Sequence, residues 1–154
     1  MRAGPAVTLV GLGLVGTGLW ARRDVRRALV RERIEPMGSS ARGRILSTPA
    51  GARSLADFIR GNVLESTGGR TYAEVDPYLD ADGTPTDDTK LAAKDPISGA
   101  PLGNPDHVLW IEATTLQTAL MQAYVAFRLA ELTMAFGAAL AFTGAAISSL
   151  ARRR

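Results

Sequence analysis

The sequence of 154 residues contains no cysteine and a single histidine, His107. Without cysteine the chain forms no disulfide, thiolate metal site or cysteine nucleophile, and a single histidine excludes a multi-histidine metal centre. The serine and threonine residues show no pattern that pairs them with a general base. The sequence therefore predicts no catalytic, cofactor-binding or metal-binding residue, and it favours a protein that is not an enzyme.

The net charge of +3 is too small to indicate a nucleic-acid partner, but the charges are unevenly distributed. Residues 1–70 contain twelve arginines and five acidic residues, and residues 71–131 contain three basic and ten acidic residues. Residues 132–154 add three arginines and no acidic residue. Such an asymmetry between segments says more about orientation and partners than the total charge does.

A run of nineteen uncharged residues extends from Ala3 to Ala21. As a helix that rises about 1.5 Å per residue it would be about 28 Å long, close to the roughly 30 Å hydrocarbon core of a bilayer. Trp20 and a dense arginine cluster stand at one end, as expected at a membrane interface. Only Met1 and Arg2 precede the run and no small-x-small cleavage site follows it, so an uncleaved transmembrane helix over 3–21 is favoured over a signal peptide.

An arginine-rich juxtamembrane helix is predicted over 22–35, directly after the first span. Basic side chains beside a bilayer are attracted to anionic lipid head groups by about 1 kcal/mol each. The arginines expected to contact head groups are Arg22, Arg23, Arg26, Arg27, Arg31 and Arg33.

A second, longer apolar segment begins at Asn104-Pro105-Asp106, which has the pattern of a helix N-terminus. Arg128 and Glu131, spaced to pair as i, i+3, interrupt this segment. An arginine in the middle of a bilayer costs about 2.5–3.5 kcal/mol. We therefore predict the second transmembrane helix over 129–151, with 105–128 as a helix that leads into the membrane.

The arginines that flank the two spans set the expected orientation. Counting only those within about 15–20 residues of a span, the loop side carries seven arginines and the terminal side carries four. This difference favours a hairpin with both termini outside and residues 22–128 in the cytoplasm.

Small residues recur every seven positions in both predicted spans. Residues on one helix face that lack bulk let two backbones approach closely, which is how lipid-embedded helices associate. We expect the two spans to pack antiparallel along these stripes, or to pair with a partner protein through them. The stripes are Gly4, Gly11 and Gly18 in the first span, and Ala130, Gly137, Gly144 and Ala151 in the second.

A competing interpretation comes from Gly11-Leu12-Gly13-Leu14-Val15-Gly16, a GxGxxG match preceded by the strand-like Val7–Val10. This is the local form of a dinucleotide-binding turn, with Glu35 as the acidic residue further on. No second apolar strand reaches Glu35, and no further βα unit follows. A soluble, Rossmann-like nucleotide-binding protein built on Gly11, Gly13 and Gly16 is therefore the alternative to the membrane protein.

Residues 36–104 are predicted to hold short amphipathic helices and loops. Residues 36–53, rich in Gly, Ser and Pro, indicate a connection, and Ser54 has the pattern of the N-cap of a helix that ends at Gly68-Gly69. Two short amphipathic helices cannot bury a sizeable core alone. We expect them to pack on the long helix, on the membrane surface or on a partner.

The second of these short helices is predicted from the capping box of Thr71 and Glu74. Residues 80–104 have the composition of a loop or a disordered segment. Their aspartates suggest a calcium loop, but an alignment that puts Gly83 at position 6 leaves Tyr78 and Thr89 where calcium ligands are needed. A solvated acidic loop is favoured.

Three stretches carry a resemblance to known sequences. They are Arg31-Glu32-Arg33-Ile34, the segment from Asn62-Val63-Leu64-Glu65 to Tyr72-Ala73-Glu74, and Thr115-Leu116-Gln117 before the last span. In this order the chain resembles a family of uncharacterised bacterial membrane proteins with two terminal transmembrane helices, over most of its length except 80–104. The resemblance implies a membrane location and transfers no activity and no catalytic residue.

These observations predict an all-α membrane protein, a hairpin of two transmembrane helices with a small helical and loop-rich region between them. We expect it in the bacterial plasma (inner) membrane as a structural or interaction module or an accessory subunit. The expected partners are the lipid bilayer and either a second copy or a larger membrane complex. Neither a cofactor nor a nucleic acid is expected.

Overall fold

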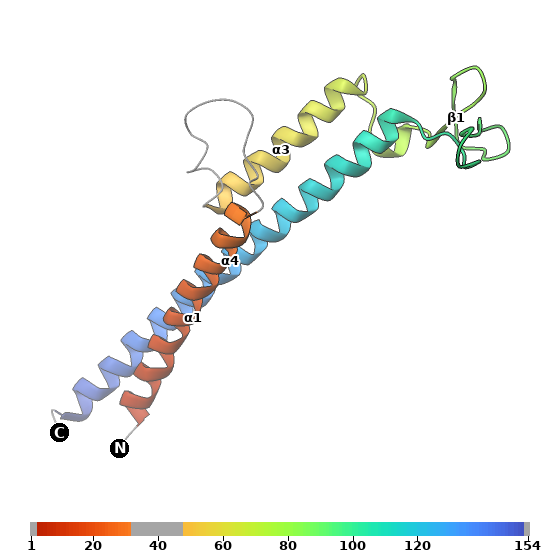
Figure 1. Ribbon diagram of the computed structural model, residues 1–154. Coiled ribbons are helices and arrows are strands. Elements are labelled where there is room, and N and C mark those ends of the chain that lie inside the picture. Colours follow the sequence, from red (N-terminus) through yellow and green to blue (C-terminus); the bar gives the residue numbers. More distant parts are fainter. Residues whose placement is uncertain (1–2, 32–47, 153–154) are drawn as a thin grey trace. The chain divides into compact units, whose positions relative to one another are not determined.

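The computed structural model describes residues 3–31 and 48–152 and is mostly helical (Figure 1). Its helices are α1 (Ala3–Arg31), α3 (Pro49–Ser66), the short 3-10 helix η1 (Tyr72–Glu74) and α4 (Pro105–Arg152), and its strands are β1 (Tyr78–Leu79) and β2 (Pro85–Thr86). The chain divides into two compact units, one formed by residues 1–53 and 121–154 and the other by residues 54–120. The mostly helical fold agrees with the predicted class, whereas the two strands were not expected.

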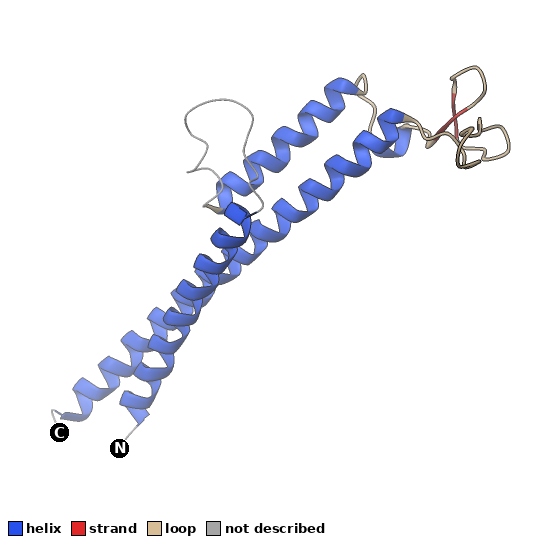
Figure 2. Ribbon diagram, in the orientation of Figure 1, coloured by secondary structure: helices blue, strands red, loops and turns tan. Residues whose placement is uncertain are grey.

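In the first unit, α1 lies antiparallel to the C-terminal part of α4, with Gly4 near Gly144 and Gly18 near Ala130. Figure 2 shows both as continuous blue helices. The predicted division between a span over 3–21 and a basic helix from residue 22 is not a structural break, because α1 continues to Arg31. The rest of the predicted basic helix, residues 32–35, lies outside the described residues.

The start of α4 is the helix N-terminus that the sequence predicts. The Asn104 side chain accepts a hydrogen bond from the Asp106 backbone N–H at 3.0 Å, and Pro105 occupies the first helical position. From there α4 runs for 48 residues without interruption, so the predicted junction at 128/129 lies within one helix. The predicted pair of Arg128 and Glu131 is confirmed, with 2.9 Å between Nη1 and Oε2.

The second unit has a small apolar core between α3 and the N-terminal part of α4. Val63, Val75, Trp110 and Ala113 are buried together, and partly buried side chains from the same elements surround them. Trp110 is the largest member, with 2% of its surface exposed. Packing of the short amphipathic segments on the long helix, one of the three expected arrangements, is therefore confirmed.

The ends of α3 agree with the sequence only in part. The predicted N-cap at Ser54 is wrong, because α3 begins at Pro49 and the Thr48 hydroxyl accepts a hydrogen bond from the Gly51 N–H at 3.1 Å. Proline suits the first helical position, so Pro49, which belongs to the predicted connection over 36–53, is the first residue of the helix instead. The predicted C-terminus is confirmed, since Gly68 and Gly69 follow α3 with φ of 65° and 83°.

The predicted capping box is present, but it closes a single turn. Glu74 accepts a hydrogen bond from the Thr71 backbone N–H at 2.7 Å, and η1 contains only three residues. Beyond it, β1 pairs antiparallel with β2, with Tyr78 opposite Thr86 and Leu79 opposite Pro85. Residues 80–104 otherwise form the turns and loops that their composition predicts.

Candidate functional site

The five glycines predicted to pack are brought together where α1 meets α4. A Cβ atom built on Gly4 would lie 2.9 Å from the carbonyl oxygen of Gly144, and one built on Gly11 would lie 2.5 Å from that of Gly137. A Cβ on Gly18 would lie 2.8 Å from the carbonyl oxygen of Ala130. Real side chains essentially never approach a backbone atom so closely, so these positions hold glycine because the opposite backbone occupies the space.

The backbone of α1 likewise leaves no room for a side chain at the glycines of α4. A Cβ on Gly137 would lie 2.7 Å from the carbonyl oxygen of Gly11, and one on Gly144 would lie 2.6 Å from that of Gly4. We call the contact formed by Gly4, Gly11, Gly18, Gly137 and Gly144 the glycine seam. Ala151, the last member of the predicted α4 stripe, is exposed.

Sequence reasoning missed the residues of α4 that line the other side of the seam. Met134, Ala141 and Ser148 contact Gly18, Gly11 and Gly4, respectively. They recur every seven residues, three residues before Gly137, Gly144 and Ala151 of the predicted stripe, so a heptad register would have found them. Two hydroxyl groups lie beside the glycine seam, those of Ser148 and Thr8. Each donates a hydrogen bond to the carbonyl four residues earlier in its own helix.

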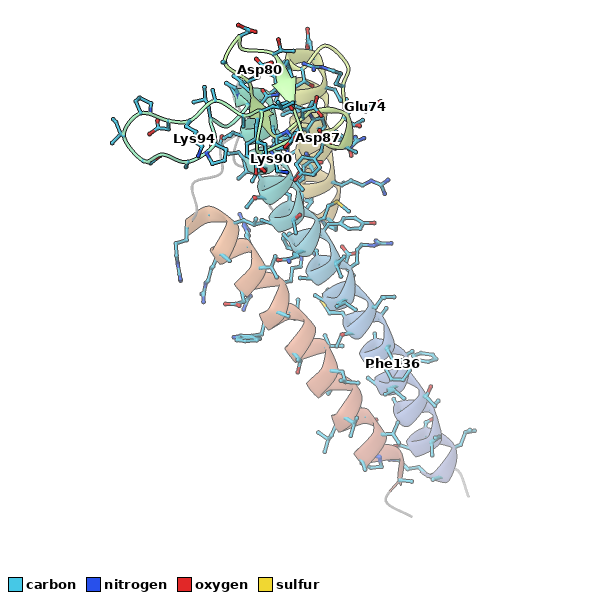
Figure 3. All side chains as sticks on the ribbon, turned by 90° about the vertical axis from the view of Figure 1, so that its right-hand side faces the viewer. Glu74, Asp80, Asp87, Lys90, Lys94 and Phe136 are labelled. Atoms are coloured by element: carbon cyan, nitrogen blue, oxygen red, sulfur yellow. The ribbon has the colours of Figure 1, made fainter. Side chains whose placement is uncertain are left out.

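Many large apolar side chains are exposed on the surface of this helix pair. Leu9 is 70% exposed, Phe136 63% (Figure 3) and Phe142 78%. Other exposed members are Val10, Leu12, Leu19, Trp20, Leu129, Leu132, Ile147 and Leu150. Both α1 and α4 are long and apolar enough, by length and composition, to cross a membrane.

Five of the six predicted head-group arginines lie on the last turns of α1, and Arg33 lies outside the described residues. Arg23, Arg26, Arg27 and Arg31 are exposed, whereas Arg22 is half-buried. The ion pairs found within residues 3–31 and 48–152 are Arg70–Asp106 and Arg128–Glu131, so none of these five arginines has a carboxylate partner there.

The GxGxxG match has no turn geometry. Gly11, Gly13 and Gly16 all lie within α1, as does the segment Val7–Val10 that was expected to be a strand. A dinucleotide site needs a strand, a tight glycine turn and a helix N-terminus at the phosphates. The predicted strand-turn-helix unit is therefore wrong at this position, and Gly11 serves a helix contact instead.

Arg70 joins the elements of the second unit. Its carbonyl oxygen accepts hydrogen bonds from the Trp110 indole N–H at 3.1 Å and from the Thr67 hydroxyl at 2.8 Å. Its guanidinium pairs with Asp106 at 2.8 Å and bonds the Thr67 carbonyl at 3.1 Å. His107 stacks on Tyr72 with ring centroids 4.8 Å apart. These contacts hold the turn that contains Arg70 against α4, and both partners of each contact lie within the second unit.

The acidic loops show no metal centre in the described part of the chain, where no group of three or more potential ligands converges. Their carboxylates cap turns instead. Asp80 (Figure 3) accepts hydrogen bonds from the backbone of Asp82 and Thr84, and Asp95 accepts from Ser98 and Ile97. Bonding to the Ser98 backbone and hydroxyl, and then to the Ile97 backbone, lowers the pKa of Asp95 below its usual range.

Comparisons with protein-family models, with curated proteins and with solved structures gave no match to this chain. The resemblance to two-span bacterial membrane proteins therefore stays a prediction from the sequence.

Proposed function

We propose that the protein is an integral membrane helical hairpin of the bacterial plasma membrane, and that it acts as a structural or interaction module or an accessory subunit of a membrane complex. Its spans are the apolar part of α1 and the part of α4 that begins near Leu129. The observation that carries the proposal is the distribution of residue size along residues 3–21 of α1 and 129–151 of α4, where the buried residues are glycine and alanine and many large apolar side chains are exposed.

This distribution is the reverse of what stabilises a helix pair in water. A soluble pair buries leucine and phenylalanine between its helices, and each such side chain contributes about 1.5–3 kcal/mol when it is removed from water. Here Phe136 and Phe142 would remain in solvent while Gly11 and Gly137 fill the contact. In hydrocarbon the exposed side chains are already in a matching medium, and close backbone contact becomes the means of association.

The positions of Arg128 and Glu131 agree with a second span that begins near Leu129. Arg128 and Glu131 form an ion pair just before Leu132, where the uncharged part of α4 begins. A paired charge at the hydrocarbon boundary avoids the penalty of about 2.5–3.5 kcal/mol that an arginine meets at the bilayer centre. Because α1 and α4 are antiparallel, Ala3 and Arg152 belong to the same end of the helix pair, and we expect both to face the same side of the proposed membrane.

Carbonate extraction of native membranes tests the proposal. We expect the full-length chain to stay in the membrane pellet at alkaline pH and to become soluble only when detergent is added. Detergent distinguishes an inserted protein from an aggregate, which would also sediment. Release by carbonate alone, or a pellet that detergent fails to dissolve, would contradict membrane insertion.

A further inference from the structure

The end of α1 has two chemically different faces. Arg23, Arg26, Arg27, Val30 and Arg31 line one shallow, open depression on its surface. Their spacing of three, four, seven and eight residues places them on one side of the helix. Gly18, Arg22, Val25 and Leu29, which are buried or half-buried, make up the opposite side. The positive charge is therefore concentrated on the side that faces away from the buried residues.

We propose that Arg23, Arg26, Arg27 and Arg31 bind the head groups of anionic phospholipids. The inference rests on the proposed membrane insertion, and it narrows the six arginines expected from the sequence to a face of four. Arg22 lies on the half-buried side. We call these four residues the arginine face.

Charge and position favour lipid as the occupant of this face. Guanidinium groups bind phosphate oxygens through paired hydrogen bonds, and the four arginines have no carboxylate partner among the residues that the structure describes. This side of α1 also carries the exposed Asp24, three residues before Arg27, but its four arginines leave it with a net positive charge. A zwitterionic lipid carries its own cation beside the phosphate, so an anionic lipid gains more from this net charge. Arg23 follows Ala21, the last residue of the uncharged run, by two positions, which places the face at head-group depth.

Trp20 provides a probe at this point of the helix. It is 66% exposed and precedes Arg23 and Arg27 by three and seven residues, so it lies on the same side of α1 one turn earlier. The chain contains one other tryptophan, Trp110, which is buried in the core of the second unit. The fluorescence of Trp110 can be measured alone in a Trp20→Phe variant and subtracted from the fluorescence of the unmodified protein.

The test uses the full-length protein in phosphatidylcholine vesicles that contain a fixed fraction of lipid with brominated acyl chains. In one series the brominated lipid is phosphatidylglycerol, and in the other it is phosphatidylcholine. We expect brominated phosphatidylglycerol to quench Trp20 more strongly at the same mole fraction. The ratio of the two quenching constants should fall as ionic strength rises, because salt screens exposed charges.

Arg27→Gln should lower this ratio by up to about fivefold, and Arg23→Gln should do the same. Arg152→Gln is the matched control, since it removes the same charge from the end of α4, where the chain leaves the membrane on the other side. It should leave the ratio unchanged.

Each other outcome has a defined meaning. Equal quenching by both lipids would overturn the lipid preference alone and point to an acidic protein segment as the occupant of the face. If Arg152→Gln lowered the ratio as much as Arg27→Gln, the net charge of the protein would explain the preference for phosphatidylglycerol, and the arginine face would be overturned as a binding site. Quenching by neither lipid would overturn membrane insertion as well.

Discussion

Gly11 and Gly137 exclude each other's side chains. A Cβ on Gly11 would lie 2.5 Å from the carbonyl oxygen of Gly137, and a Cβ on Gly137 would lie 2.7 Å from that of Gly11. The obstacle in both directions is backbone, which cannot rotate away as a flexible side chain can. The distance between α1 and α4 is therefore set by two residues that lack a side chain.

Gly11→Leu should destabilise the hairpin, because the new side chain must push the helices apart. Overpacking of a close contact costs about 1–3 kcal/mol, and the rigid backbone opposite places this substitution at the upper end. Thermal unfolding of the purified protein in detergent measures the loss. Gly144→Leu, at the other end of the seam, should have a similar effect.

Gly13→Leu is the matched control for Gly11→Leu. Gly13 lies two residues further along α1, and a Cβ built on it meets nothing within 4 Å. Replacement of glycine in a helix interior by a better helix former favours the helix by up to about 1 kcal/mol. Equal loss of stability in both variants would contradict the glycine seam as the contact that holds the pair.

How far the sequence predicts this fold depends on whether a feature is local. The N-terminus of α4 was predictable because Asn104, Pro105 and Asp106 carry all of its information within three residues. The glycine spacing of seven likewise marks one face of a helix. Which residues lie opposite Gly11 depends on the register between two helices, and that register is a tertiary property.

The features that sequence reasoning missed arise from contacts between distant residues or from ambiguous local patterns. Arg70 and Asp106 are 36 positions apart, and nothing near either residue indicates the other. The strands β1 and β2 contain two residues each, too few to show a period of two. Pro49 was ambiguous, since proline fits both a connection and the first position of a helix.

Trp110→Phe should destabilise the second unit by about 1–3 kcal/mol, the net value of one hydrogen bond together with the cost of a smaller buried side chain. Phe keeps a six-membered ring, but the five-membered ring and the indole N–H that reaches the Arg70 carbonyl are lost. The Thr67 hydroxyl lies 2.8 Å from that carbonyl and 2.8 Å from the Val63 carbonyl, so its single proton is shared and replaces the lost bond only in part. Chemical denaturation in detergent measures the change, and Trp20→Phe, at an exposed position, should leave stability unaltered.

The turn at Thr71 should respond to acid through Glu74. Hydrogen bonds from the Thr71 backbone, and then from its hydroxyl, lower the pKa of Glu74 below its ordinary value of 4.5. A carboxyl group with a lowered pKa stabilises the fold above its unfolded pKa, and this contribution disappears as pH falls through the folded pKa. We expect protection of the Thr71 amide from hydrogen exchange to be constant near neutral pH and to decrease below pH 4.5.

Glu74→Gln provides the control for this pH dependence. The variant keeps a side-chain acceptor but cannot ionise, so the corresponding change in Thr71 protection should be absent. A decrease of the same size in the variant would assign the pH response to another group.

We predict the orientation of the proposed hairpin from the arginines on its two sides. With seven arginines flanking the spans on the loop side and four on the terminal side, residues 22–128 should lie in the cytoplasm and both termini outside. Alkaline phosphatase fused after Arg154 should then be active, because it folds only outside the cytoplasm, and a green fluorescent protein fused there should be dark.

Replacing the exposed Arg23, Arg26, Arg27 and Arg31 by glutamine leaves three loop-side arginines against four, so the fusion signals should reverse or become mixed. A fluorescent fusion on the unmodified chain would contradict this orientation while leaving the α1–α4 pairing intact.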